Sequence, residues 1–414
     1  MSTPKPGLRT ALIGLSASAI TSWASTAHLP GLLTPTGRSK LPLKALLNSS
    51  VDAAKAAIQK YNLPPDTKAY GSPEDLANDP DIDLVICNTR VDKHFETILP
   101  SIKKGKDVFV EWPVAANLKD VETLVEEARR SGSRVAVGLQ RRWTPPAVKL
   151  REILKDGVNG RELGKILSVD VRAYGGTNDR DVVPEGLSYF LDREVGGNVI
   201  VIGNGHGEFI HIHTHPPPQP QQIRVHANLI SVLDTVLSVT GPLSPKTIHT
   251  TLHLQRPTVH IRNPTTSAIT KTLPSNVPDI LSLTARLLHS PAPFTYSFRR
   301  GQPFLGDPAL TWSIALEHAE VRLVSREGLN LETGEPARIL VDWYGEEGVE
   351  EVKWGWEDEF EGLGGSARNV IKTLVAFGEG REEGDGWVGL EDAAGRARLI
   401  EGFLAGWEKE RKGE

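Results

Sequence analysis

The sequence has a single cysteine, Cys87, among 414 residues, and it has no long apolar run. One cysteine excludes an internal disulfide and fits a reducing compartment. No stretch approaches the ~20 apolar residues of a membrane span, and residues 1–7 lack the apolar core of a signal peptide. Basic charge is not in excess, because the formal net charge is −5, so the chain has no general attraction to nucleic acid or anionic membranes. We therefore expect a cytoplasmic or nuclear protein that binds neither nucleic acid nor a membrane directly.

Strand-like and helix-like stretches alternate in the first third of the chain. Apolar strands are predicted at residues 10–14, 44–47, 83–87, 108–110 and 134–138, and helical spacing occurs at residues 51–60 and 118–128. Strands that are apolar throughout are typical of a parallel sheet covered on both faces. The pattern predicts an α/β fold, with a doubly wound parallel sheet over residues 8–145 that binds a dinucleotide.

Residues 146–414 have a different pattern, as expected for a second domain in a chain of this length. Residues 166–174 alternate apolar and polar side chains, which is typical of a half-buried antiparallel strand. Further strands are predicted at residues 248–254, 293–298, 315–323 and 337–343, a solvated edge at residues 346–361, and a closing helix at residues 390–407. We expect an α+β domain with an open, mainly antiparallel sheet.

The segment 207–231 does not fit this domain. Its Pro- and Gln-rich tract at residues 216–222 cannot lie inside a helix or a sheet. His211, His213 and His215 would share one face of a strand, but no fourth zinc ligand is evident, so we expect no metal. The segment is predicted to be a disordered surface insertion or, because its ends can be encoded by splice-site sequences, a retained intron.

The turn after the first predicted strand is the first candidate for cofactor binding. Gly14 allows a tight turn, and Ser16 and Ala17 are small enough for a pyrophosphate to approach the backbone. At the tip of the second strand, Asn48 and Ser49 stand where an acidic residue would bind the ribose of NAD. Since both are neutral, the cofactor is predicted to be NAD or NADP.

Other candidate cofactor residues follow the third and fifth predicted strands. Asn88, Thr89 and His94 come after the third strand, and Gln140 and Arg141 come after the fifth. Ligands of doubly wound sheets bind at the carboxyl ends of the strands. The alternatives remain a capping or surface role for His94, and salt bridges at a domain boundary for Arg141 and the arginine that follows it.

The fourth predicted strand ends in Glu111, Trp112 and Pro113. If this strand closes a nucleotide-binding domain, we expect the residue between this glutamate and the proline to face the nicotinamide. An enzyme that oxidises an alcohol would use a lysine there to polarise the oxygen and pass a proton. Trp112 can stack on a ligand but carries no transferable proton, so Glu111 and Trp112 are predicted to contact the cofactor without the usual chemistry.

His206 and Asp234 are the best candidates for catalysis. They would lie on one helix face if residues 207–231 were absent, and such a pair can act as acid and base on a sugar hydroxyl. With the insertion present, that geometry is not assured.

Together these motifs resemble the glucose–fructose oxidoreductase, inositol dehydrogenase and MocA family (Gfo/Idh/MocA). The similar stretches are the Gly14 turn, residues 70–76, 105–111 and 140–142, and the split pair His206 and Asp234. The resemblance implies a Rossmann domain, a C-terminal domain whose open sheet builds dimers, and NAD(P) chemistry on sugars and polyols. Trp112 stands where the family has its catalytic lysine.

Within the family, the chain is similar to a branch of fungal regulators of galactose genes, which shares the tryptophan at this position. Residues 22–24, 28–30, 277–279 and 297–303 also resemble that branch. The resemblance implies a dinucleotide-binding homodimer that binds a transcriptional activator protein and catalyses nothing known. Our interpretation is such a regulator, and the alternative is an oxidoreductase acting on a sugar, a polyol or a sugar derivative.

Overall fold

The computed structural model describes residues 7–18, 22–175, 179–198, 200, 229–326, 328–329, 331–332, 337–356 and 359–413. These residues form two compact units. The first comprises the described residues of Met1–Gln140, Glu194–Gly197 and Asp358–Glu401, and the second comprises those of Arg141–Arg193, Asn198–Glu357 and Gly402–Glu414. Of the predicted insertion at residues 207–231, only the last three residues are described, and they begin a helix.

A seven-stranded sheet forms the centre of the first unit, in the order β18-β6-β5-β4-β1-β2-β3. Its strands are β1 (Thr10–Ile13), β2 (Leu43–Leu47), β3 (Lys68–Tyr70), β4 (Leu84–Cys87), β5 (Asp107–Glu111), β6 (Val135–Gly138) and β18 (Val388–Gly389). All pairs are parallel except β18 with β6. The six parallel strands have the order of a dinucleotide-binding Rossmann sheet, with β1 at the point where the order reverses.

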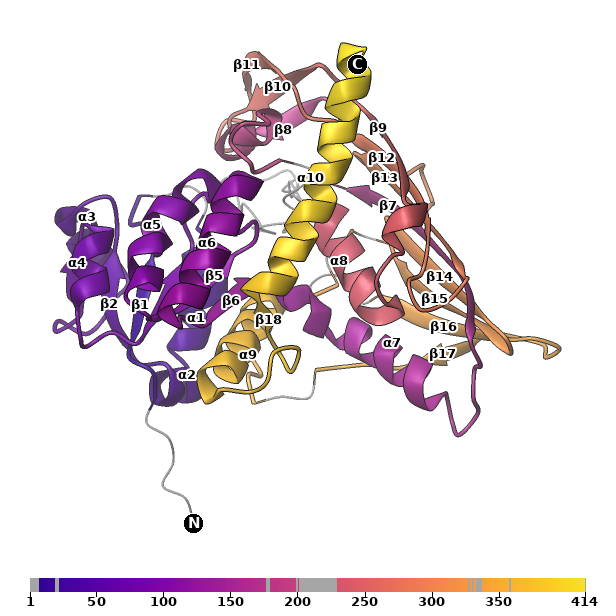
Figure 1. Ribbon diagram of the computed structural model, residues 1–414, viewed down its shortest axis with the longest axis horizontal. Helices are drawn as coiled ribbons and strands as arrows, with labels where there is room; N and C mark the ends of the chain where they lie inside the picture. Colours follow the sequence, from indigo (N-terminus) through magenta and orange to yellow (C-terminus); the bar gives the residue numbers. More distant parts are fainter. Residues whose placement is uncertain are drawn as a thin grey trace, which may run out of the picture. The chain divides into compact units, whose positions relative to one another are not determined.

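Helices lie on the sheet of the first unit, as Figure 1 shows. They are the π-helix η1 (Ala24–His28), α1 (Leu29–Leu32), α2 (Pro35–Lys40), α3 (Val51–Lys60), α4 (Pro73–Asn78), α5 (Val91–Lys103), α6 (Leu118–Ser131) and α9 (Gly365–Glu379). Helix α5 packs beside α4 and α6, whereas α9 packs beside η1, α1 and α2. Side-chain oxygens of Ser50, Ser72 and Asn117 cap α3, α4 and α6 and satisfy N–H groups that have no partner within the helix.

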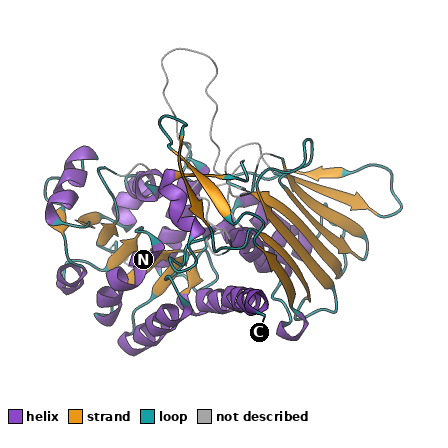
Figure 2. Cartoon of the chain, turned by 90° about the horizontal axis from the view of Figure 1, so that it is seen from above, coloured by secondary structure: helices purple, strands orange, loops and turns teal. Residues whose placement is uncertain are grey.

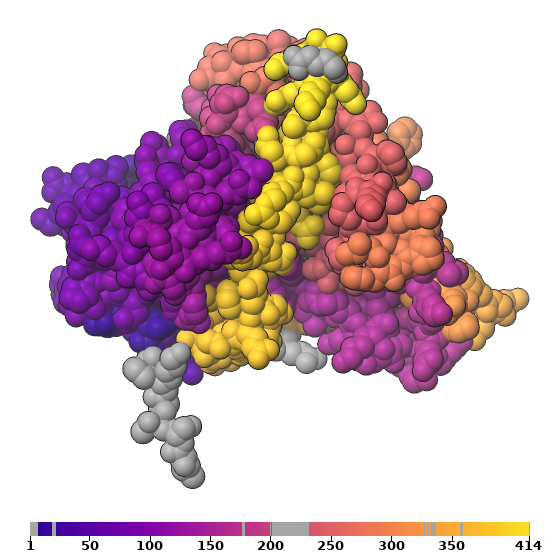
Figure 3. Space-filling model, in the orientation of Figure 1, coloured from indigo at the N-terminus to yellow at the C-terminus, as the bar shows by residue number. Residues whose placement is uncertain are grey.

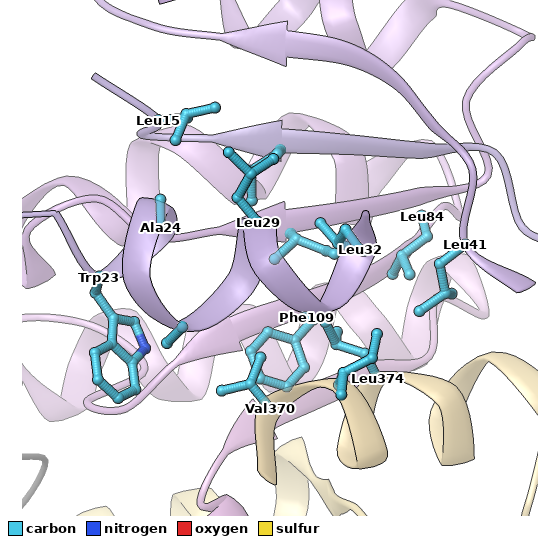
Figure 4. Close-up of a cluster of buried hydrophobic side chains, with 14 of the residues drawn as sticks. Leu15, Trp23, Ala24, Leu29, Leu32, Leu41, Leu84, Phe109, Val370 and Leu374 are labelled. Carbon is cyan, nitrogen blue, oxygen red and sulfur yellow. The ribbon is translucent and has the colours of Figure 1, made fainter. Parts of the chain in front are cut away.

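The core of the first unit joins segments that are far apart in the sequence. Phe109 of β5 and Leu84 of β4 pack with Leu32 of α1 and with Val370 and Leu374 of α9 (Figure 4). All five side chains are buried. Helix α9 therefore completes a core whose other buried residues come mostly from the first third of the chain.

The second unit is built on an eight-stranded sheet in the order β17-β16-β15-β14-β7-β13-β12-β9. Its strands are β7 (Ile166–Gly175), β9 (His249–His253), β12 (Ile280–Arg286), β13 (Pro293–Arg300), β14 (Leu310–Leu316), β15 (Ala319–Ser325), β16 (Arg338–Trp343) and β17 (Glu350–Val352). Figure 2 shows them as a fan of neighbouring arrows. Only β7 and β13 pair in parallel, so the sheet is mainly antiparallel, as predicted.

Smaller elements complete the second unit. They are the strands β8 (Val182–Pro184), β10 (Thr258–Arg262) and β11 (Ile269–Pro274), the 3₁₀ helices η2 (Gln140–Trp143), η3 (Glu185–Leu191) and η4 (Pro245–Thr247), and the helices α7 (Pro145–Asp156) and α8 (Leu229–Thr240). Strands β11, β10 and β8 form a separate sheet. The last helix, α10 (Leu390–Lys412), has one side at the molecular surface (Figure 3). None of the described helices combines the length and the apolar composition needed to cross a membrane.

The predicted fold class is confirmed: a Rossmann-type parallel sheet is followed by a domain with an open, mainly antiparallel sheet. The predicted single strand at residues 315–323 is wrong, because the chain reverses at Glu317 and His318 to form the hairpin of β14 and β15. Apolar and polar residues alternate on both sides of this two-residue turn, so the reversal was not evident from the sequence. The return of α9 and β18 to the first unit was not predicted by any pattern.

Candidate functional site at the carboxyl edge of the parallel sheet

Gly14 ends β1 in a conformation that requires glycine. Its φ is +89°, and a Cβ at this position would lie 2.9 Å from the carbonyl oxygen of Asn88 and 3.2 Å from the amide nitrogen of Thr89. The Gly14 amide donates a hydrogen bond to the carbonyl oxygen of Leu47. The turns after β1 and β4 therefore meet at backbone distance, at the edge where Rossmann sheets bind a pyrophosphate.

Three side chains hold the loop that follows. They donate hydrogen bonds to the carbonyl oxygens of residues 15–17: Asn48 Nδ2 at 2.8 Å, Tyr61 Oη at 3.1 Å and Lys60 Nζ at 2.7 Å. Asn48 thus anchors the loop, whereas its predicted neighbour Ser49 is exposed. Sequence reasoning missed Lys60, the last residue of α3, and Tyr61, which follows it, since neither belongs to a motif. Lys60 places a positive charge beside the turn.

Asn88 and Gln140 bring unsatisfied polar atoms to the same edge of the sheet. Neither the Oδ1 nor the Nδ2 of Asn88 has a hydrogen-bond partner among the described residues, although both atoms are buried. The buried Oε1 of Gln140, just after β6, has none among them either. Leaving a buried polar group unpaired costs ~1–3 kcal/mol. These atoms are therefore suited to bind a polar ligand.

His94 ties together the loops after β4 and β5. Its Nε2 lies 2.8 Å from the carbonyl oxygen of Thr89, and its Nδ1 lies 2.8 Å from that of Pro113. Burial lowers the pKa of His94, although the two carbonyl oxygens and the charge of Glu111 oppose the shift. A neutral imidazole donates only one hydrogen, so only one of the two contacts is a full hydrogen bond. His94 is thus a buried residue that contacts the loops after β4 and β5, and it is not a surface histidine.

Glu111, at the end of β5, is engaged by two residues of the η1 region. Its Oε1 accepts a hydrogen bond from Trp23 Nε1 at 2.9 Å and lies 2.6 Å from His28 Nε2. The ring of His28 meets the ring of Phe109 edge to face at 5.6 Å. Gly138 leaves the space that the other carboxylate oxygen occupies, since a Cβ there would lie 2.4 Å from Glu111 Oε2. Trp23 and His28 thus fix the carboxylate that precedes Trp112.

The pair Trp23 and His28 was not predicted as part of the site. The two residues are five positions apart, which is the spacing that a π-helical hydrogen bond spans; Trp23 caps the π-helix η1, and His28 is its last residue. A search for α-helical spacing of three or four residues does not detect such a pair. Short π-helical segments are frequent at functional sites.

Trp112 is buried, with 3% of its surface exposed. It lies between the fixed Glu111 and Pro113, and the Trp112–Pro113 peptide bond is cis. The side chain at this point is thus a large flat aromatic group, which carries no transferable proton.

The edge of the first unit fits a dinucleotide. The Gly14 turn provides the close backbone approach that a pyrophosphate needs, and the unsatisfied atoms of Asn88 and Gln140 offer donors and acceptors. Of the predicted cofactor residues, the structure brings together those of the first unit other than the exposed Ser49: Gly14, Ser16, Ala17, Asn48, Asn88, Thr89, His94, Glu111, Trp112 and Gln140. A bound nicotinamide would supply hydride transfer, and these residues would orient and shield it.

Arg141, Arg142 and Asp234 belong to the second unit. Arg142 donates two hydrogen bonds to Asp234, from Nε to Oδ2 at 2.9 Å and from the guanidinium Nη2 to Oδ1 at 2.8 Å. Asp234 is 1% exposed, so this bidentate pair holds it as a carboxylate. Burial lowers the pKa of Arg141, and the charge of Glu332 opposes that shift. The other predicted catalytic residue, His206, lies outside the described residues.

Residues 8–139 match the Gfo/Idh/MocA model, described as the oxidoreductase family with an NAD-binding Rossmann fold. This part of the chain is therefore similar to that family. The Gfo/Idh/MocA region thus covers β1 to β6, which is the part of the chain that carries the Gly14 turn and Glu111.

Similar proteins include an enzyme and a regulator. This chain is 34% identical to "Dehydrogenase aclE" of Aspergillus oryzae over 200 residues, which are 48% of this chain and 52% of that relative. It is 23% identical to the galactose/lactose metabolism regulatory protein GAL80 of Saccharomyces cerevisiae over 302 residues, which are 72% of this chain and 61% of that relative. These matches span only about half to three fifths of the relatives' lengths. The crystal structure of the transcriptional regulator Gal80p of Kluyveromyces lactis has the same fold, with a TM-score of 0.77, 19% identity and coverage of 99% of this chain and 94% of that one.

Proposed function

We propose that this protein is a dinucleotide-binding transcriptional regulator of the galactose-repressor type and that it does not oxidise sugars. The observation that carries the proposal is the side chain of Trp112. It follows the fixed carboxylate of Glu111 at the place where an alcohol-oxidising enzyme needs a proton carrier, and it is buried.

The ion pair in the second unit supports the same proposal. Asp234 was the candidate base, but both of its oxygens accept hydrogen bonds from Arg142. A carboxylate held in this way is a poor proton acceptor, because protonation would break a buried charge-assisted pair. The pair therefore disfavours catalysis by Asp234.

The proposed regulator binds NAD or NADP at the Gly14 turn and binds a transcriptional activator protein, in the nucleus or the cytoplasm. The similarity to the regulatory protein GAL80 supports a role in galactose metabolism. It acts as a homodimer. Support for the dimer comes from the eight-stranded sheet, where α8 packs against β7 on one face while Asp170 and Arg172 of β7 are exposed on the other.

The test separates binding from turnover. Calorimetric titration with NAD and NADP should give heat of binding, whereas mixtures of either oxidised cofactor with aldoses and polyols should form no reduced nicotinamide. A Trp112→Lys variant restores a proton carrier, and we expect it to gain a trace of turnover, since acid–base catalysis supplies ~10²–10⁴ in rate. Robust turnover by the natural sequence would reject the regulator and establish the dehydrogenase.

A dehydrogenase is the second candidate, and the identity with the Aspergillus dehydrogenase is the observation that favours it. This candidate requires a proton carrier other than lysine. Loss of turnover in an Asp234→Asn variant that still folds and still binds the dinucleotide would assign that role to Asp234. An unchanged rate in this variant would exclude Asp234.

A further inference from the structure

Two arginines of the second unit converge on one carbonyl oxygen. The Nη2 atom of Arg180 lies 3.3 Å from the carbonyl oxygen of Gln302, and the Nη2 atom of Arg299 lies 3.1 Å from the same oxygen. One carbonyl oxygen is a weak partner for two guanidinium groups, which together carry ten N–H donors (five each). Most of their donors therefore remain available for another acceptor.

No carboxylate neutralises this pair among the described residues. The neighbouring acids are committed elsewhere: Asp181 pairs with Arg256 at 2.5 Å, and Asp179 pairs with Arg262 at 3.2 Å. Burial lowers the pKa of Arg299, and the positive charges of Arg180 and Arg256 add to the shift. The two positive charges are thus held close together, and a bound anion would offset their repulsion.

The backbone holds Arg180 in place. Gly301 has a φ of +101°, and a Cβ there would lie 2.1 Å from the Cγ of Arg180. The stem of Arg180 therefore lies directly across Gly301, and its Nε is buried without a hydrogen-bond partner among the described residues. An arginine fixed along its stem loses little side-chain entropy when it binds a ligand.

Arg299 is also held in place. It lies at the end of β13, in register with Tyr174 of β7, and its guanidinium carbon is 5.0 Å from the centre of the Tyr174 ring. This distance is within the range of a cation–π contact. Both arginines are thus positioned by packing and not by carboxylates.

We propose that Arg180 and Arg299 form a binding site for an oxyanion, the phosphate or carboxylate group of a small ligand or cofactor. Both anions match the planar fork of a guanidinium and accept two parallel hydrogen bonds from it. The buried Nε of Arg180 gains its missing acceptor when the oxyanion binds. The site lies wholly within the second unit and does not depend on the proposed regulatory function.

The experiment is a calorimetric titration of the full-length protein with inorganic phosphate and, separately, with acetate, at constant ionic strength and with saturating NAD. We expect a dissociation constant on the order of 1 mM for at least one anion, as for a small, partly solvated ion pair. Binding of phosphate alone identifies a phosphoryl ligand, and binding of acetate alone identifies a carboxylate ligand. Binding of neither anion overturns the proposal.

Variants locate the binding. Arg180→Gln and Arg299→Gln should each weaken it at least tenfold, whereas Arg180→Lys, which keeps the charge and the stem, should weaken it less. Arg286→Gln is the matched control, because Arg286 is an exposed arginine on the neighbouring strand β12, and it should bind as the natural protein does. If either glutamine variant melts at the natural temperature and still binds with unchanged affinity, the anion binds elsewhere and the proposal is wrong.

Discussion

At the scale of single residues, Gly14 decides whether the first turn can accept a dinucleotide. Alanine at this position would have to adopt a φ near +89° with its Cβ 2.9 Å from the carbonyl oxygen of Asn88. The two turns would then move apart, and the backbone would no longer approach the pyrophosphate. We expect Gly14→Ala to abolish NAD(P) binding in a calorimetric titration.

Gly132 provides the matched control for this substitution. It caps α6 with a φ of +76°, and a Cβ there would meet no atom within 4 Å. Gly132→Ala should therefore cost about 1 kcal/mol of stability through backbone strain and leave NAD(P) binding intact. Equal binding by both variants would show that the Gly14 turn does not hold the cofactor.

Glu111 should stabilise the first unit as well as shape its site. Glu111→Ala leaves the buried donors of Trp23 and His28 without their acceptor, which should lower the free energy of unfolding by ~3 kcal/mol. Glu111→Gln keeps an acceptor oxygen and should cost less. Urea unfolding measures both losses. Glu122→Ala is the control, since the ion pair that Glu122 forms with Arg398 is exposed and such a pair is worth less than ~1 kcal/mol. A loss for Glu111→Ala no larger than that of the control would contradict the packing described for η1.

Sequence patterns identified some residues of the site at the carboxyl edge of the parallel sheet and missed others, for a physical reason. Gly14 and Glu111 lie at strand ends, where short-range patterns are informative. Trp23 and His28 act through a carboxylate more than eighty positions away, and their five-residue spacing belongs to a helix type that is rare in proteins. Asp234 was predicted as a catalytic partner of His206, but its bidentate contact with Arg142 is a tertiary contact that no local pattern encodes.

At the scale of elements, the edge strand β3 of the seven-stranded sheet takes part in an ionic network. Lys68 of β3 donates hydrogen bonds to both carboxylate oxygens of Asp79, after α4, and Tyr70 donates one at 2.6 Å. Burial alone would raise the pKa of Asp79, but the hydrogen bonds from Lys68 and Tyr70 lower it to about 2. The network fastens β3, a strand that the sequence analysis did not predict because it has only three residues.

This network should make stability depend on pH in acid. The folded-state pKa of Asp79 lies below its unfolded value of ~3.9, so its contribution is complete above pH ~4 and is lost as the pH falls toward 2. We expect Asp79→Asn to lower the unfolding free energy by about 1–2 kcal/mol at pH 7 and to lose less stability than the natural protein between pH 4 and 2. Urea midpoints at pH 7, 4 and 3 measure both effects.

Asp66→Asn, at an exposed site, is the control. A constant difference in stability between the natural protein and Asp79→Asn across these pH values would show that Asp79 does not titrate as described.

The strand pattern was most informative where strands are long and half-buried. Residues 166–174, which alternate from Ser168 onward, correspond to β7, and the predicted strand at residues 337–343 corresponds to β16. The hairpin of β14 and β15 was missed because its turn, Glu317 and His318, lacks glycine, proline and asparagine, the residues that mark most turns. Helix α9 joins the first unit through Val370 and Leu374, a long-range contact that composition alone does not reveal.

At the scale of the whole molecule, the exposed face of the eight-stranded sheet should join two copies of the chain. Arg172 lies on β7, in the middle of that sheet, and it is exposed. A two-fold interface brings equivalent residues together, so Arg172→Glu would gather carboxylates from both copies, including those of the neighbouring Asp170. We expect light scattering after size-exclusion chromatography to give the mass of a dimer for the natural protein and that of a monomer, or a dimer weakened at least tenfold, for the variant.

The control is Arg129→Glu on α6 of the first unit, where Arg129 is exposed, and it should remain a dimer. A monomeric natural protein, or an Arg172→Glu variant that dimerises as tightly as the control, would exclude this face as the interface.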